Sequence, residues 1–205
     1  MIENHNERND EVSMPDKMKN SVASGGKHLK TAEENDLFDW VQCVMAALLL
    51  SILAFLFLGR TVSVSGPSME STLFSGERVL ISNLFYQPKQ GDVVVFRKDS
   101  YKREALIKRI IALEGQTVSI DFDEGIVYVD GTALEEDYVN TPTNVPLDFD
   151  GKITVPEGCV FVLGDNRNKS NDSRDDRIGC VDERYILGRA VLRLTPISRF
   201  GKIDR

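Results

Sequence analysis

The sequence has few of the side chains that metal sites and most hydrolases use. Only two histidines occur, His5 and His28, and the three cysteines, Cys43, Cys159 and Cys180, include no C-x-x-C pair. This scarcity argues against a zinc site built from Cys and His. Cys159 and Cys180 could pair in an oxidising compartment, but a single pair is no disulfide framework, so two small buried thiols are the favoured interpretation.

A basic stripe is also missing. The 205 residues carry 32 acidic and 25 basic side chains, a formal net charge of −7. Nucleic-acid binding depends on clustered Lys and Arg, so a nucleic-acid partner is not expected. The length suits one folded domain with appendages.

The N-terminal part changes character sharply. Residues 1–36 are polar, with charges of both signs, and predict a disordered cytoplasmic tail. The 19 residues Trp40–Leu58 contain no charge. A helix of that length rises about 28 Å, close to the thickness of a bilayer's hydrocarbon core. We therefore expect a transmembrane helix over 37–59, with Trp40 and Arg60 near the two interfaces.

A cleavable signal peptide is the alternative, since the "SVS" at 63–65 has the small-x-small pattern of a cleavage site. The apolar core of a signal peptide usually has about 7 to 15 residues, and a long polar tail rarely precedes it. An uncleaved anchor is favoured.

The positive charges near the span indicate its orientation. More of them precede the apolar run than follow it closely: Lys19, Lys27 and Lys30 against Arg60 and Arg78. This bias predicts an N-terminus inside the cell and a domain from residue 60 to 205 on the extracytoplasmic face of the cell membrane.

That domain has the pattern of a β-rich fold. Short β-branched or apolar runs alternate with Gly, Pro, Asp and Asn, and no amphipathic helix is evident beyond residue 60. The spacing predicts a mostly β protein with a compact antiparallel sheet or barrel. The runs span 78–85, 91–97, 104–113, 116–122, 125–131, 152–158, 159–165 and 189–197.

The segment "SGPSMESTL", residues 65–73, places Ser68 shortly after the span. Both histidines lie in the N-terminal tail, across the membrane from the domain, so a nucleophilic Ser68 would need a lysine as base. Taken alone, Ser68 is a turn residue, because Gly and Pro precede it.

A lysine acts as a base only when neutral, so its pKa must fall from about 10.4, chiefly by desolvation. Lys108, within "EALIKRIIAL", has the most apolar surroundings of the domain's lysines. Strand alternation would place it on one face with Leu106, Ile110 and Ala112, opposite Ile107, Arg109 and Ile111. A surface lysine on an edge strand is the alternative.

A third polar segment, "GDNRNKSNDSR" at 164–174, directly follows an apolar strand. It is either a solvated hairpin or a hydrogen-bonded shell around a site. A hydroxyl there could orient a buried neutral amine without restoring its charge.

Together, "SGPSMESTL", "LIKRIIALEGQTV" and "VFVLGDNRNKSNDSR" in this order, behind a membrane span, closely resemble type I signal peptidase over residues 38 to 196. The resemblance implies a membrane-anchored serine endopeptidase with a Ser/Lys dyad and no metal or cofactor. It would remove signal peptides from exported preproteins, after small-x-small sites, at the outer face of the cytoplasmic membrane.

The resemblance also implies roles for individual residues. Ser68 matches the nucleophile, Lys108 the general base and Ser170 the serine that orients the lysine. The supporting polar loop matches Asp165, Asn166, Arg167, Asp172, Ser173 and Arg174. The apolar substrate pockets match Val64, Met69, Leu73, Leu106 and Ile107.

Two features of the sequence indicate which branch of the family it resembles. The backbone N–H of Ser68 would hold the oxyanion, but Gly66 stands where some members add a serine hydroxyl, as in the Gram-positive branch, so the second donor is open. Only 55 residues separate Lys108 from Gly164, which leaves no room for the large inserted subdomain of some Gram-negative members.

Two other functions remain alternatives. A self-cleaving repressor-type protease uses related Ser/Lys chemistry but lacks a membrane span. A catalytically inactive, membrane-anchored β-domain could act as a binding module, although binding alone would not require Ser68, Lys108 and Ser170 together.

Overall fold

The computed structural model describes residues 36–53, 60–98 and 100–203 and divides the chain into two units, Met1–Ala54 and Phe55–Arg205. In the first unit a helix spans Asp36–Leu53, 18 residues that are long and apolar enough to cross a membrane. Its large apolar side chains are exposed. Residues 1–35 of the predicted tail, and residues 54–59 of the predicted span, lie outside the described residues.

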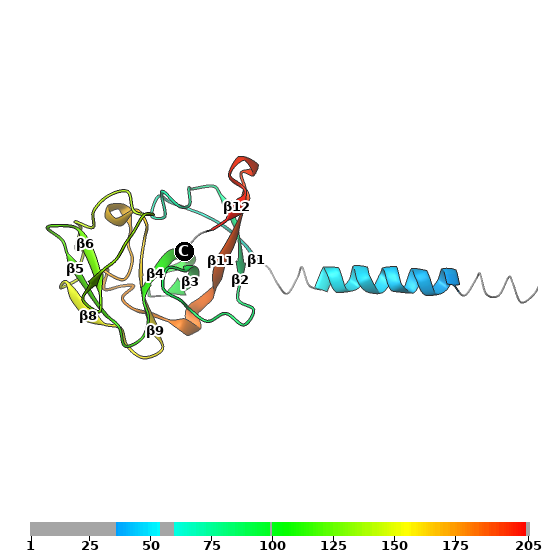
Figure 1. The fold of residues 1–205 in the computed structure, drawn as a ribbon, viewed down its shortest axis with the longest axis horizontal. Coiled ribbons are helices and arrows are strands. Elements are labelled where there is room, and N and C mark those ends of the chain that lie inside the picture. The colour runs from blue at the N-terminus through cyan, green and yellow to red at the C-terminus, as the bar shows by residue number, and fades with distance from the viewer. Residues whose placement is uncertain (1–35, 54–59, 99, 204–205) are drawn as a thin grey trace, which may run out of the picture. The chain divides into compact units, whose positions relative to one another are not determined.

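The second unit is built from antiparallel strands in two sheets (Figure 1). The larger, eight-stranded sheet has the order β1-β2-β11-β3-β4-β9-β10, with β12 also paired to β11. The smaller sheet has the order β7-β6-β5-β8 and lies at one end of the domain in Figure 1. The strands are β1 Arg60–Ser63, β2 Arg78–Ser82, β3 Val93–Lys98, β4 Lys102–Ala112, β5 Thr117–Asp121, β6 Ile126–Val129, β7 Thr132–Ala133, β8 Lys152–Thr154, β9 Cys159–Leu163, β10 Val181–Asp182, β11 Ile186–Thr195 and β12 Gly201–Lys202.

The predicted mostly β, antiparallel fold with one apolar N-terminal helix is confirmed. Each of the eight runs identified in the sequence contains a strand. The strands missed are the four-residue β1 and the two-residue β7, β10 and β12. Two residues are too few to display an alternation of polar and apolar side chains. Short 3-10 turns, such as Arg167–Lys169, are the helical elements within the described part of this domain.

Three apolar clusters form the core. The first includes Val64, Met69 and Leu73 together with residues of β2, β3 and β11. The second joins β5 and β6 of the small sheet to Phe161 and Leu163 of β9, so the two sheets share a core. The third lies around Val94 and Phe96 of β3 and the facing part of β9.

Strand β4 departs from regular alternation near its end. Ile107 lies in the first cluster, while Ile110, with the partly buried Leu106 beside it, lies in the third, as alternation predicts. A register shift against β9 between Ile110 and Ala112 then turns Ala112 into the second cluster beside Ile111. The prediction that Ala112 shares a face with Lys108 was therefore wrong, because a bulge changes which face a residue occupies.

Cys159 and Cys180 are free thiols that pack against the second cluster. Burial is the main cause that raises the pKa of Cys180 to about 11. This thiol therefore remains protonated at neutral pH. Both cysteines are half-buried, so the favoured interpretation of two buried thiols holds only in part.

Candidate active site

The structure brings Ser68 and Lys108 into direct contact. Lys108 Nζ donates hydrogen bonds to Ser68 Oγ at 2.8 Å and to the carbonyl oxygen of Ile107 at 3.0 Å. Ser68 lies in the turn that follows Pro67, and Lys108 is 40 residues away in β4. A hydroxyl and an amine at this distance can exchange a proton directly.

Lys108 is an interior residue. Strand β4 pairs with β3 on one side and β9 on the other, and Lys108 lies opposite Val94. Only 3% of the lysine is exposed, so the surface-lysine alternative does not apply. Removal from water disfavours an ammonium ion more than a neutral amine, which is the condition for a base.

At Gly164 the backbone of the polar loop packs tightly against both Ser68 and Ser170. A Cβ atom at Gly164 would lie 2.2 Å from Ser170 Oγ and 2.5 Å from the carbonyl oxygen of Ser68. No left-handed φ is involved, so the requirement for glycine is steric. The same Ser68 carbonyl accepts a hydrogen bond from the backbone N–H of Asn166 at 3.0 Å. Residues 164 to 166 thus hold the backbone of Ser68.

Ser170 is buried, with 5% exposed, and its Oγ has no hydrogen-bond partner in the described part of the chain. An unsatisfied buried hydroxyl is uncommon and marks a place where a ligand or water can bond. Its contact with Lys108 therefore remains a prediction, while its position directly against Gly164 places it beside the Ser68 backbone.

The segment 164–174 is not a solvated hairpin. Asp172 is fully buried and accepts hydrogen bonds from the backbone N–H of Gly164 at 3.0 Å and from Arg174 Nε and Nη2, both at 2.9 Å. Arg174 also donates to the carbonyl oxygen of Val145 at 2.6 Å. Ser173 Oγ accepts the N–H of Val162 at 2.9 Å. These bonds fasten the loop to β9 and so fix Gly164.

A second buried ion pair joins strand β4 to the polar loop. Arg109, 1% exposed, donates from Nε and Nη2 to the two carboxylate oxygens of Asp165 at 2.9 and 2.8 Å. Thr72 Oγ1 donates to the same carboxylate at 2.5 Å. The Arg109 guanidinium lies over the ring of Tyr138, with 3.9 Å between its central carbon and the ring centroid. This pair links the turn of Ser68, strand β4 and the polar loop.

Arg167 connects the loop to the segment that follows the small sheet. Its guanidinium pairs with Glu136 and donates to Thr143 Oγ1 at 2.8 Å and to the carbonyl oxygen of Gly164 at 3.1 Å. Burial, followed by the charge of Glu136, raises the pKa of Tyr138, which therefore stays protonated. The loop is held by three arginines whose charges are compensated inside the protein.

Four of the five predicted pocket residues lie together. Val64, Met69, Leu73 and Ile107 belong to the first core cluster, with between 0 and 7% exposed. Leu106 packs instead against the third cluster. Adjacent strand residues point to opposite faces, so Leu106 and Ile107 line different surfaces.

The oxyanion position has one candidate donor. Within the described residues no bond is recorded for the Ser68 backbone N–H, which leaves it available to a ligand. Gly66 has a φ of +84°, a conformation that disfavours serine there. No group of three or more His, Cys, Asp or Glu side chains suited to a metal ion occurs among the described residues.

Sequence reasoning missed several residues of this site. Thr72, Glu136 and Tyr138 sit in unremarkable contexts, and their roles depend on contacts with residues far away in the chain, such as Asp165 for Thr72. Gly164 could have been singled out, because a glycine directly after a buried strand often marks a close approach of two backbones.

Comparison with known proteins gives the family. Residues 37–195 match the family described as "Signal peptidase, peptidase S26". The chain belongs to this family. The probable signal peptidase I-1 of Synechocystis is 37% identical over 173 residues, which cover 80% of this chain and 85% of the relative. The signal peptidase I of Bacillus licheniformis is 34% identical over 184 residues, 85% of this chain and 97% of the relative.

The crystal structure of a signal peptidase I from Enterococcus faecalis is 32% identical in sequence to this chain. It covers 52% of this chain and 98% of its own, with a TM-score of 0.43. The type I signal peptidase resemblance carried by the three motifs is confirmed by the family match and by the Synechocystis and Bacillus relatives.

Proposed function

We propose that this protein is a membrane-anchored serine endopeptidase that removes signal peptides from exported preproteins by a Ser68/Lys108 dyad. The observation that carries the proposal is the 2.8 Å contact between Ser68 Oγ and the buried Lys108 Nζ. Family membership supports the substrate class, and cleavage after small-x-small sites follows from the same resemblance.

The chemistry needs only residues of this chain. Neutral Lys108 takes the proton of Ser68 as Oγ attacks the scissile carbonyl carbon, and the resulting ammonium then protonates the leaving amine. The backbone N–H of Ser68 stabilises the oxyanion. In the second half, Lys108 takes a proton from water as the water oxygen attacks the acyl carbon, and it then gives this proton to Ser68 Oγ as the ester bond breaks, which restores both residues. The unsatisfied Ser170 hydroxyl is the proposed partner that orients the lysine.

The exposed apolar side chains of the N-terminal helix support the proposed membrane anchor. The helix Asp36–Leu53 leaves its apolar side chains uncovered by protein. A continuous exposed apolar surface of this kind fits a lipid environment. We propose residues 37–59 as the anchor, 1–36 as the cytoplasmic tail and 60–205 as the extracytoplasmic domain. Between Arg60 and Ser68 an extended chain reaches at most about 29 Å, so the nucleophile stays near the bilayer that holds its substrate.

The structure of β1 supports an anchor that is retained. A cut after the "SVS" at 63–65 would remove β1, which pairs with β2 along its whole length. It would also remove Val64, a buried residue of the first core cluster whose N–H donates to the Glu77 carbonyl at 2.8 Å. Loss of that strand would expose core and leave hydrogen bonds of β2 unmade.

The test uses the full chain in detergent with a preprotein that has an Ala-x-Ala site. We expect a cut after the second Ala, identified by the mass of the new N-terminus, and no cut by a folded Ser68→Ala variant. Cleavage by neither protein, with both folded, would favour the inactive binding module. Cleavage by the folded Ser68→Ala variant would place the nucleophile elsewhere.

A further inference from the structure

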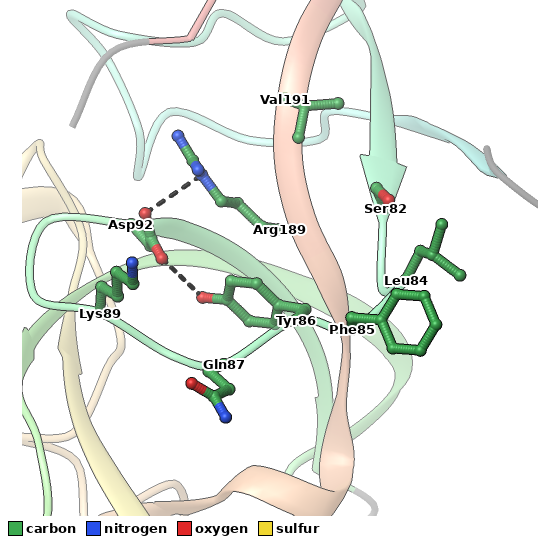
Figure 2. Close-up of a pocket in the computed structure, with 9 residues that line it drawn as sticks. All are labelled: Ser82, Leu84, Phe85, Tyr86, Gln87, Lys89, Asp92, Arg189 and Val191. Carbon is green, nitrogen blue, oxygen red and sulfur yellow. Dashed lines mark hydrogen bonds and ion pairs between the residues drawn. The ribbon is translucent and has the colours of Figure 1, made fainter.

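The domain contains a pocket of about 300 Å³ between the β2–β3 connection and β11 that plays no part in the proposed reaction. Its lining includes two cations, Lys89 and Arg189, the acidic Asp92 with Tyr86, and the apolar Leu84 and Phe85 (Figure 2). We call it the β2–β3 pocket.

The pocket lies at the end of the sheet where the chain enters the domain. Arg60, the first residue of β1, pairs with Ile81 near the end of β2. In β11, Arg189 pairs with Ser82, the last residue of β2. The connection that carries Leu84 to Lys89 leaves from this end. Six residues, 54–59, separate Leu53 of the candidate span from Arg60. The seven Cα–Cα steps from Leu53 to Arg60 cover at most about 25 Å in an extended chain.

The apolar side chains at this end are unusually exposed. Phe85 is 94% exposed and Leu84 is 54% exposed, although both follow a strand whose alternate residues are buried. Figure 2 shows Phe85 turned away from Asp92. Neighbouring exposed apolar residues of this kind suit contact with a bilayer rather than with water.

The polar side of the pocket is arranged for an anion. Asp92, 1% exposed, is its one acidic group, and this carboxylate accepts Tyr86 Oη at 2.9 Å and pairs with Arg189 Nε at 3.1 Å. For the terminal nitrogens of Arg189 no bond is recorded within the described chain, and none for Lys89 Nζ. Arg189 balances the charge of Asp92. The additional positive charge of Lys89 therefore makes the net charge of the pocket positive.

We propose that the β2–β3 pocket binds the phosphodiester headgroup of an anionic phospholipid, between Lys89 Nζ and the terminal nitrogens of Arg189. Leu84 and Phe85 then contact the acyl chains of the same leaflet. Phosphate oxygens suit an ammonium and a guanidinium that are both available, and a cation near an anionic leaflet contributes measurably to its binding. Docking would hold the domain at the bilayer surface. This inference rests on the proposed membrane anchoring.

The test reports on docking independently of cleavage. The single tryptophan, Trp40, is changed to Phe, and Phe85→Trp introduces a reporter in the full chain, reconstituted into vesicles with brominated acyl chains. The vesicles contain phosphatidylcholine alone or phosphatidylcholine with phosphatidylglycerol. We expect stronger quenching of the reporter when phosphatidylglycerol is present. Lys89→Gln should lower the ratio of docked to undocked protein about fivefold in those vesicles.

Two further variants make the result specific. Arg189→Lys keeps a positive charge for Asp92 but removes the guanidinium fork, so it should also weaken the phosphatidylglycerol effect while the domain stays folded. Lys152→Gln, an exposed lysine of β8 in the small sheet, should change nothing.

Three results would overturn the proposal. Quenching that is equal in both vesicles would show apolar insertion without headgroup recognition. Quenching unaffected by Lys89→Gln and Arg189→Lys would place the headgroup elsewhere. Reversal of the quenching by inorganic phosphate would identify a site for a free anion. Preprotein cleavage in the same vesicles separates the two proposals, since lost cleavage with intact quenching would contradict only the peptidase assignment.

Discussion

Replacing Gly164 by alanine tests how closely Ser68 and Ser170 are packed. The added Cβ would lie 2.2 Å from Ser170 Oγ, 2.5 Å from Ser170 Cβ and 2.5 Å from the Ser68 carbonyl oxygen, whereas ordinary contacts begin at 3.4 Å. At least one of the two serines must therefore move by about 1 Å. Overpacking of this kind costs about 1–3 kcal/mol of folding stability. A shift of about 1 Å in a reacting group lowers the rate about 100-fold.

The assay compares kcat/KM for an Ala-x-Ala preprotein with thermal unfolding followed by circular dichroism. Gly201→Ala is the matched control, because nothing lies within 4 Å of its added Cβ and no left-handed φ is involved. We expect Gly164→Ala to lose activity about 100-fold while still folding, and Gly201→Ala to match the wild type. A Gly164→Ala enzyme with unchanged kcat/KM and unfolding temperature would refute the packing described for the two serines.

Asp172→Asn leaves the buried Arg174 without a compensating charge, so urea unfolding should show a loss of about 3–5 kcal/mol. Asp182→Asn, in an exposed pair, should barely move the midpoint, and equal midpoints for both variants would contradict this account. Burial, followed by Cys159, raises the pKa of Cys180 from 9.0 to about 11. The unfolded thiol ionises first, so this contribution to stability is complete below pH 9 and is lost as the pH rises to 11. The unfolding free energy of Cys180→Val should fall less steeply than that of the wild type over this interval, and parallel curves would argue against a buried thiol. Cleavage should increase with pH through a midpoint below the value of about 10.4 for free lysine, because burial favours neutral Lys108, and an increase only near pH 10 would speak against a buried base.

Much of the fold could be predicted because the main strands have a local signature. β-branched runs between turn residues located eight of the twelve strands, and the apolar run located the helix. The bulge in β4 could not be predicted, since it depends on how that strand pairs with β9, which lies some fifty residues further along the chain. The edge strands of two residues depend likewise on partners supplied by the tertiary fold.

Ser68 and Lys108 could be predicted from the sequence for a chemical reason. With no histidine in the domain, an activated Ser68 required a lysine in apolar surroundings, and Lys108 alone has such neighbours. The residues that support this pair could be predicted only in part. The loop of residues 164–174 was identified, but the pairing of Arg109 with Asp165 joins residues 56 positions apart, and no local pattern encodes it.

Lys108→Met tests the central claim most directly. Methionine has a similar length, suits an apolar site and cannot accept a proton, so the variant should fold while losing the base. Cleavage of the Ala-x-Ala preprotein would be measured in detergent beside Lys152→Met, an exposed control, with circular dichroism for folding. We predict a fall in cleavage rate of about 10²–10⁴-fold for Lys108→Met and none for the control. A folded Lys108→Met protein that cleaves at the wild-type rate would show that the base lies elsewhere.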